Sequence, residues 1–135
     1  MAFLIDTNVA IHLRDLNKAV VERVAALSND VAMSIVTVVE LEGGIGLNPK
    51  SAMARRLLLD EMIEVLPILT FGESEAALYG RIVARLGFSR PRILDRMIAA
   101  QAMATGATLI TMNGSDFKDI EGLQLEIWPS PAGLN

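Results

Sequence analysis

The sequence predicts an α/β fold built around a parallel sheet. Short apolar runs, which suit buried strands, alternate with longer amphipathic segments, which suit helices. A length of 135 residues suits one compact domain with a real core. No repeat, linker or low-complexity tract interrupts the chain. We therefore expect a single domain over residues 1–135, with a loose tail from about residue 129.

Each element is assigned from its apolar pattern and its flanking residues. The expected strands are Phe3–Ile5, Val31–Val36, Val65–Leu69, Leu109–Met112 and Gln124–Trp128. The third is weakened by Pro67, because proline cannot donate a hydrogen bond to a sheet. The expected helices are Val9–Leu13, Lys18–Leu27, Val38–Leu47, Ala52–Ile63, Ser74–Leu86 and Ile93–Ala104. Asn17 should cap the second helix, and Gly87 and Gly106 stand where helices end in a left-handed residue.

Composition limits the classes of function. There is no Cys, which excludes disulfides and thiolate metal sites and fits a reducing cytoplasm. The N-terminus does not resemble a signal peptide, and no apolar run is long enough to span a membrane. A net charge of -4 argues against nonspecific polyanion binding. A hydrophobic fraction of 52% predicts apolar surface for a homodimer, a partner groove or both.

Two acids follow the first two expected strands. Asp6 directly follows the first strand, at the sheet edge where ligands bind in open α/β folds. An equally good explanation is that Asp6 caps the next helix; Thr7 and Asn8 are also good N-cap residues for that helix. Glu40 follows the second strand, where the spacing from Thr37 favours a capping box in isolation. Glu42 points about 200° away around a helix, so only one of the two glutamates can face a site.

Two further acids lie in the second half of the chain. Asp95 sits in an unusually apolar helix, where an isolated buried carboxylate is unfavourable unless it is paired or bound to a metal. Its alternative, an ion pair with Arg92, is weaker, and we favour a functional role. Asp116 follows the fourth strand; alternatively it ends a turn and caps a short helical turn at 117–120. Asp119 is a nearby acid that could be confused with it.

Taken together, the four acids point to a metal site. Three of them follow expected parallel strands, so the fold should bring them together. Clustered carboxylates need a counter-charge, and oxygen-only ligands select Mg²⁺ or Mn²⁺ over zinc. The single histidine, His12, cannot build a histidine-rich zinc site, and it has no evident serine partner for a nucleophilic triad.

Three sequence blocks carry a resemblance to a known family. FLIDTNV, MSIVTVVELEGG and DRMIAAQAMATGATLITMNGSDF, in this order, resemble a PIN domain, and more closely the VapC-like toxins of type II toxin–antitoxin modules. The resemblance implies a three-layer α/β/α sandwich with a mostly parallel sheet. It also implies Mg²⁺- or Mn²⁺-dependent endoribonuclease activity, homodimerisation and inhibition by a VapB-like antitoxin. Contact with DNA would be indirect, through the antitoxin.

The resemblance also implies roles for individual residues. The family's four acids fall on Asp6, Glu40, Asp95 and Asp116, and two supporting positions fall on Thr7 and Asn113. We expect Asp6 and Asp95 to ligate the metal directly and Asp116 directly or through water. Glu40 would ligate through water or orient the nucleophile. Candidates for RNA phosphate contacts are Arg90, Arg92, Arg96 and Lys118, although ordinary solvated surface charge is as good an explanation for them.

Two other classes of protein remain as alternatives. A noncatalytic PIN-like module that binds RNA or protein would keep the fold without metal-dependent cleavage, but it has no use for four clustered acids. A phosphoacceptor receiver domain would want paired acids at the first strand and a late lysine. Asp6 has no acidic neighbour and Lys118 is the only late lysine, so the receiver is the weaker alternative.

Overall fold

A computed structural model describes residues 2–131 of the chain. Five parallel strands form one sheet in the order β3-β2-β1-β4-β5. The strands are β1 (Phe3–Ile5), β2 (Val31–Ser34), β3 (Ile68–Leu69), β4 (Thr108–Thr111) and β5 (Leu125–Ile127). The helices are α1 (Thr7–Arg14), α2 (Lys18–Ala25), α3 (Ile35–Gly44), α4 (Ala52–Val65), α5 (Glu73–Leu86) and α6 (Ile93–Thr105). Short 3-10 turns are η1 (Ile45–Leu47), η2 (Arg90–Arg92) and η3 (Gly114–Asp116).

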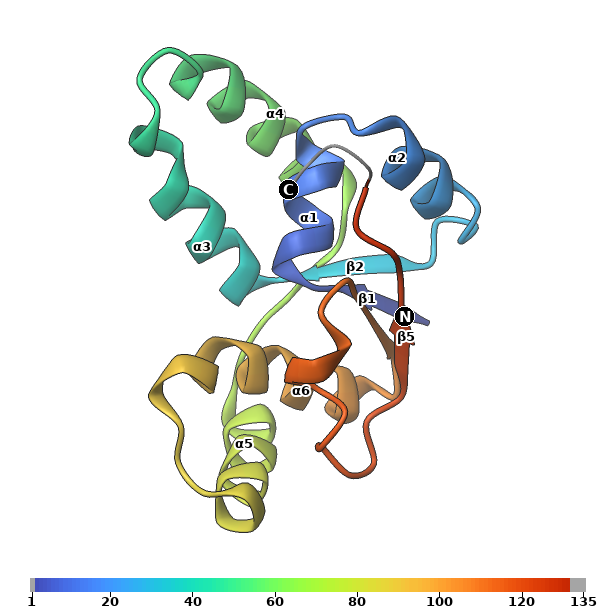
Figure 1. Cartoon of the computed structure of the whole chain (residues 1–135), viewed down its shortest axis with the longest axis vertical. Helices are drawn as coiled ribbons and strands as arrows, with labels where there is room; N and C mark the ends of the chain where they lie inside the picture. The colour runs from blue at the N-terminus through green and yellow to red at the C-terminus, as the bar shows by residue number, and fades with distance from the viewer. Residues whose placement is uncertain (1, 132–135) are drawn as a thin grey trace.

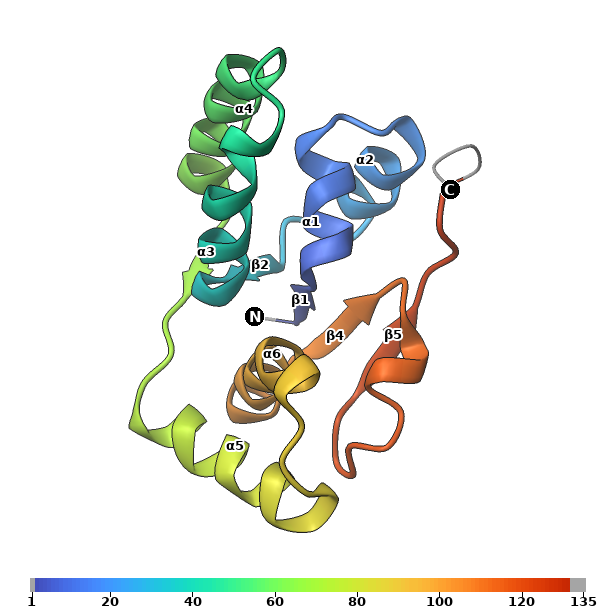
Figure 2. The same cartoon turned by 60° about the vertical axis from the view of Figure 1, so that its left-hand side comes forward.

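The helices cover both faces of the sheet. Figure 1 shows α1, α2, α3 and α4 on one side of the strands and α5 and α6 on the other. Figure 2 shows the same division from a second direction, with α3 beside α4 and α1 beside α2; α1 also contacts α3 and α4. The predicted three-layer α/β/α arrangement around a parallel sheet is confirmed.

Successive strand residues feed two separate cores, as the two-residue period of a strand requires. In β1, Leu4 packs with the α5 and α6 side, whereas Ile5 packs with the α1, α2 and α4 side. In β4, Leu109 and Ile110 divide in the same way. The central strands are therefore apolar on both faces and read as continuous hydrophobic runs in the sequence.

Helix caps explain where the first three helices begin. Asp6 accepts a hydrogen bond from Val9 N at 3.0 Å, so α1 starts at Thr7, two residues earlier than predicted. Asn17 caps α2 as predicted. Ser34 accepts from Val36 N at 2.9 Å and starts α3 directly after β2. The strand predicted at Val31–Val36 was therefore too long, because the Ser34 cap turns the following apolar residues into a helix.

The edges of the sheet are shorter than predicted. β3 has two residues instead of five, because α4 continues to Val65 and Pro67 has no N–H to donate. The Pro67 carbonyl still accepts from Met33 N, which places β3 beside β2. Gly106 ends α6 in the left-handed conformation, as predicted. Gly87 ends α5 with a positive φ of 87° but an extended ψ of 156°, so it does not adopt the left-handed conformation predicted for it.

Two observations concern the rest of the chain. Residues 129–131 have no regular secondary structure, and the remainder of the expected tail lies outside the described residues. Over residues 2–131, no helix is both long and apolar enough to cross a membrane.

The order of the strands defines the position of the site. The chain moves outward from β1 through β2 to β3, then returns to the other side of β1 to form β4 and β5. The carboxyl ends of β1 and β4 are the point where the direction reverses, which is where open α/β sheets bind ligands. Asp6 stands at this point, and its backbone N–H donates to Ile110 O at 3.0 Å.

Candidate active site

Asp6 is a buried carboxylate at the end of the central strand. It is 5% exposed, and it accepts hydrogen bonds from Val9 N and from the Thr111 hydroxyl. Burial raises the pKa of Asp6, Glu40 adds to the increase, and the hydrogen bonds from Thr111 and Val9 oppose it. Asp6 therefore caps α1 and also presents a carboxylate at the sheet edge, so the two explanations offered by the sequence are compatible.

Glu40 reaches the same region from α3. Its Oε1 accepts from the Thr7 hydroxyl at 2.6 Å, and Thr7 Oγ1 lies 3.0 Å from Thr37 Oγ1. The capping box predicted for Thr37 and Glu40 is wrong, because α3 begins three residues earlier at its Ser34 cap. Glu42 points elsewhere and pairs with Arg56, which lowers the pKa of Glu42.

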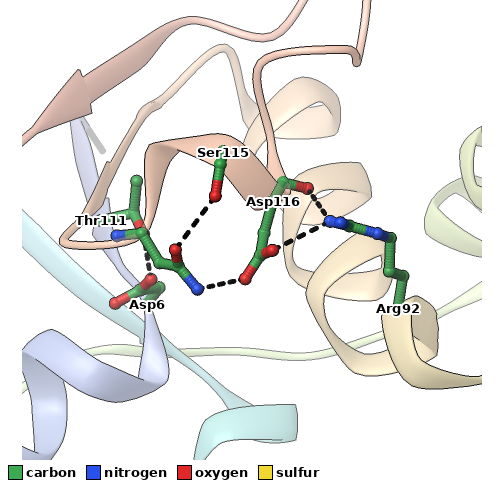
Figure 3. Close-up of polar contacts among 6 residues, drawn as sticks. Asp6, Arg92, Thr111, Ser115 and Asp116 are labelled. Carbon is green, nitrogen blue, oxygen red and sulfur yellow. Dashed lines mark hydrogen bonds and ion pairs between the residues drawn. The ribbon is translucent and has the colours of Figure 1, made fainter.

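Asp116 ends the turn η3 and is held from two sides. Arg92 Nη1 donates to Asp116 Oδ1 at 3.1 Å and to the Asp116 main-chain oxygen at 3.0 Å. The other carboxylate oxygen accepts from Asn113 Nδ2. Figure 3 shows these contacts together with the bond between Thr111 and Asp6. Because Arg92 pairs with Asp116, the alternative explanation of Asp95 as an ion-pair partner of Arg92 is not the arrangement that forms.

Asp95 lies in the first turn of α6, one and two turns before the fully buried Ala99 and Ala102. Burial raises its pKa to about 6, and the charges of Asp116, Asp6 and Glu40 act in the same direction, whereas Arg92 lowers the pKa. All three of the other predicted acids therefore act on Asp95. Four acids from different elements share one electrostatic environment at the carboxyl edge of the sheet.

The donor set fits a hard divalent cation in its chemistry. The ligands on offer are carboxylate oxygens, and the pKa of Asp95 is raised first by burial and then by the negative charges of Asp116, Asp6 and Glu40, which a cation would offset. Among the described residues, however, no three acidic or histidine side chains already stand together as a ready metal-ligand group. Three of these carboxylates instead accept hydrogen bonds from protein side chains: Asp6 from Thr111, Glu40 from Thr7 and Asp116 from Arg92. Binding a cation therefore requires these carboxylates to share or exchange their present partners.

The four basic residues predicted to contact RNA differ in position. Arg90 and Lys118 are exposed, and Arg92 is partly exposed beside Asp116. Arg96 is 4% exposed, and its Nη1 donates to the Gly87 carbonyl at 2.7 Å. This burial argues against the phosphate contact predicted for Arg96, since its guanidinium supports the turn after α5.

Sequence reasoning missed Thr111 and Thr37, which orient the acids. Thr111 is the last residue of β4, and the pairing of Ile5 with Ile110 makes it the neighbour of Asp6. Strand order and register would have found Thr111, but neither can be read from a single strand. Thr37 is fully buried on the face of α3 that meets Thr7.

A separate groove lies among α1, α2 and α4 and the residues that connect them to the sheet. Its volume is about 660 Å³, and most of its lining is apolar. The lining residues are Leu13, Arg14, Leu16, Val21, Val24, Ala25, Asn29, Val31, Leu58, Glu61, Met62, Val65, Leu66 and Pro67. Leu16 and Val65 stand 65% and 72% exposed at this groove.

Comparisons with known proteins agree with this fold and show the family to which the chain belongs. Residues 3–123 match the PIN domain family. The chain is 33% identical to ribonuclease VapC1 of Haemophilus influenzae strain R2866, over 95% of this chain and 98% of that protein. It is 29% identical to the tRNA(fMet)-specific endonuclease VapC of Shigella flexneri, over 95% and 98%. It is also similar to a solved structure, that of VapBC2 from Rickettsia felis bound to a promoter DNA fragment. The TM-score is 0.83 and the identity 26%, over 95% of this chain and 99% of that one.

A parallel sheet with acidic side chains near its switch point defines an α/β protein whose candidate site lies at the carboxyl edge of the sheet. The chain belongs to the PIN domain family, within its VapC ribonuclease group.

Proposed function

We propose that this chain is the endoribonuclease toxin of a toxin–antitoxin pair and hydrolyses RNA phosphodiester bonds with Mg²⁺ or Mn²⁺, acting in the cytoplasm. The observation that carries this proposal is the buried carboxylate of Asp6 at the switch point of the sheet, with Glu40, Asp95 and Asp116 near enough for their charges to act on one another. Relatives named as ribonucleases and as a tRNA(fMet)-specific endonuclease support RNA as the substrate.

Each acid has a distinct place in the proposed reaction. Asp6 and Asp95 are the proposed metal ligands. Asp6 is buried at the switch point, and Asp95 makes no ion pair among the described residues, since Arg92, whose charge acts on it, is paired with Asp116. A bound divalent cation supplies Lewis-acid stabilisation and lowers the pKa of water. Glu40, held by Thr7, orients the attacking water or accepts its proton. Asp116 is held in place by Arg92 and Asn113.

Cleavage of RNA by the purified protein tests the proposal. The substrates are a structured RNA and initiator tRNA, the latter chosen because of the relative from Shigella flexneri. Each is incubated with Mg²⁺, Mn²⁺ or EDTA. We expect cleavage with either metal, none with EDTA, and none by Asp6→Asn or Asp95→Asn. Metal-dependent cleavage by folded Asp6→Asn would refute the site.

The third helix offers a matched control. Glu40→Gln and Glu42→Gln make the same chemical change two residues apart, but only Glu40 bonds Thr7 while Glu42 pairs with Arg56. We expect Glu40→Gln to reduce RNA cleavage and Glu42→Gln to leave it unchanged. Failure of the wild-type protein to cleave any RNA with either metal would favour the alternative, a noncatalytic PIN-like binding module.

The proposed partner is a VapB-like antitoxin whose apolar segment occupies the groove among α1, α2 and α4. The groove is mostly apolar, as the segment of a permanent partner requires, and the similar solved structure is a VapBC complex. The groove lies at the carboxyl end of α1, whereas Asp6 stands at its start, so we propose that an arginine outside the groove-bound segment of the antitoxin pairs with the four acids and inhibits the site. Contact with DNA would come through the antitoxin.

A second copy of the chain is the other proposed partner. Large apolar side chains outside the groove stay exposed, including Val39, Phe88 and Leu94 at 65%, 64% and 43%. Light scattering during size-exclusion chromatography should give the mass of a dimer. A stable monomer at all concentrations would contradict this proposal.

A further inference from the structure

Arg92 and Asp116 form the one ion pair among the clustered acids in the described part of the chain. A single nitrogen, Nη1, donates to both Oδ1 and the main-chain oxygen of Asp116. Because one of these acceptors belongs to the backbone, the guanidinium is fixed relative to the turn η3 and not merely to a rotating carboxylate. Figure 3 shows Arg92 reaching Asp116 from the start of α6.

The positive charge of Arg92 acts on the whole cluster. The charges that act on Asp95 are three carboxylates and one guanidinium, that of Arg92. The next arginine along α6, Arg96, is buried against the Gly87 carbonyl and does not serve this purpose. Arg92 is therefore the cation that the protein itself places among its acids.

We infer that the Arg92 guanidinium takes the place of a second divalent cation, so that the site holds a single metal ion on its Asp6 and Asp95 side. This inference rests on the proposed nuclease function. Two-metal nucleases hold ions about 3.5–4 Å apart that neutralise shared carboxylates and charge on the phosphate. A guanidinium bonded to Asp116 occupies one such carboxylate, and its charge repels a second ion from that position.

The remaining donors of Arg92 can serve the substrate. A guanidinium carries five N–H donors, and only Nη1 is used on Asp116. The others remain available for a phosphate oxygen, as in arginine clamps that stabilise developing negative charge. The RNA contact predicted for Arg92 is therefore compatible with its pairing with Asp116, because Nη1 positions Asp116 while the other nitrogens keep donors for a phosphate oxygen.

The inference is tested by counting the Mn²⁺ ions bound per chain in the absence of RNA. Calorimetric titration gives one count, and the decrease of the electron paramagnetic resonance signal of free Mn²⁺ gives an independent one. The variants are Arg92→Met, which keeps the apolar stem without the charge, and Arg92→Lys, whose single nitrogen can replace Nη1. Arg90→Met removes an exposed charge two residues away and is the matched control. We expect about one ion per chain for wild type, Arg92→Lys and Arg90→Met, and about two for Arg92→Met.

Two ions of similar affinity on the wild type would overturn the inference, as would a single ion on folded Arg92→Met. The wild-type count stands even if Arg92→Met fails to fold. Wild-type protein that cleaves RNA but binds two ions overturns this inference alone. Protein that binds no Mn²⁺ and cleaves no RNA overturns the proposed function with it.

Discussion

The Thr7 hydroxyl donates a 2.6 Å hydrogen bond to Glu40 Oε1 and so joins the start of α1 to the second turn of α3. Thr7 Oγ1 also lies 3.0 Å from Thr37 Oγ1. A hydroxyl has one proton, which Thr7 uses on Glu40, so Thr37 must be the donor in the second bond. The result is a directed chain from Thr37 through Thr7 to the carboxylate. Thr37, at the start of this chain of hydrogen bonds, is fully buried, so the orientation of Glu40 is fixed from the protein interior.

Replacing Thr7 by Val should therefore reduce catalysis without unfolding the protein. Valine keeps the shape of threonine but cannot donate to Glu40, and losing such a supporting hydrogen bond typically reduces activity about 10- to 100-fold. Thr7→Ser keeps the hydroxyl and should retain most of the activity. Single-turnover cleavage rates of the two variants make the comparison. Equal rates for Thr7→Val and wild type would show that Glu40 does not depend on this bond.

Two substitutions of Asp6 should separate its contribution to stability from its contribution to catalysis. Asp6→Asn keeps an oxygen that can accept from Val9 N, so the cap of α1 survives while the charge is lost. Asp6→Ala removes the cap as well and should lower the free energy of unfolding by about 1 kcal/mol relative to Asp6→Asn. Both should lack cleavage. Urea unfolding measures the difference, and equal stability of the two variants would contradict a capping role.

Much of this arrangement could be predicted from the sequence, because the signals are local. The apolar run before Asp6 and the caps at Asn17 and Gly106 depend on neighbouring residues only. Asp95 stood out because a carboxylate in an apolar helix is hard to explain otherwise.

The features that were missed depend on distant pairing. The pairing of Asp6 with Thr111 follows from the register of β1 and β4, over a hundred residues apart. The end of β2 was misplaced because the apolar residues after Ser34 suit a strand as well as a helix, and the hydroxyl cap decided between them. The burial of Arg96 depends on where the turn after α5 comes to lie.

Leu16 should lower the free energy of unfolding, although it lines the groove proposed to bind the antitoxin. It has a φ of 60° and is 65% exposed, a conformation that is unfavourable by roughly 1–2 kcal/mol for most residues and easier for Asn. Another residue with positive φ in the described chain is Asn29, which tolerates it. Leu16→Asn should therefore raise the free energy of unfolding by about 1 kcal/mol, measured in urea without partner.

The same substitution should weaken binding of the antitoxin. Leu16 lines the groove, and loss of one apolar contact of about 1.5 kcal/mol corresponds to roughly tenfold in affinity. Calorimetric titration with the VapB-like antitoxin measures this, while RNA cleavage in its absence should not change. A variant that is stabilised but binds the antitoxin as tightly as wild type would place the binding surface elsewhere.

Asp95 should make the metal-free protein less stable as the pH rises. Its pKa lies at about 6 in the folded protein against an ordinary value of 3.8, because of burial and the charges of Asp116, Asp6 and Glu40. Between these two values the folded state binds more protons than the unfolded chain, so stability falls as pH increases through this window. Burial raises the pKa of Asp6 in the same direction.

Metal-free protein should therefore be more stable at about pH 5 than at about pH 7, by on the order of 1 kcal/mol from Asp95, since partial exposure screens the shift. Asp95→Asn has no such titration, so its stability should change less between the two pH values and exceed that of wild type at the higher one. Urea unfolding in EDTA measures both. Metal affinity should show the opposite trend and fall below about pH 6, because a protonated carboxyl is a poor ligand. If wild type and Asp95→Asn lost the same stability between the two pH values, Asp95 would not be the group responsible.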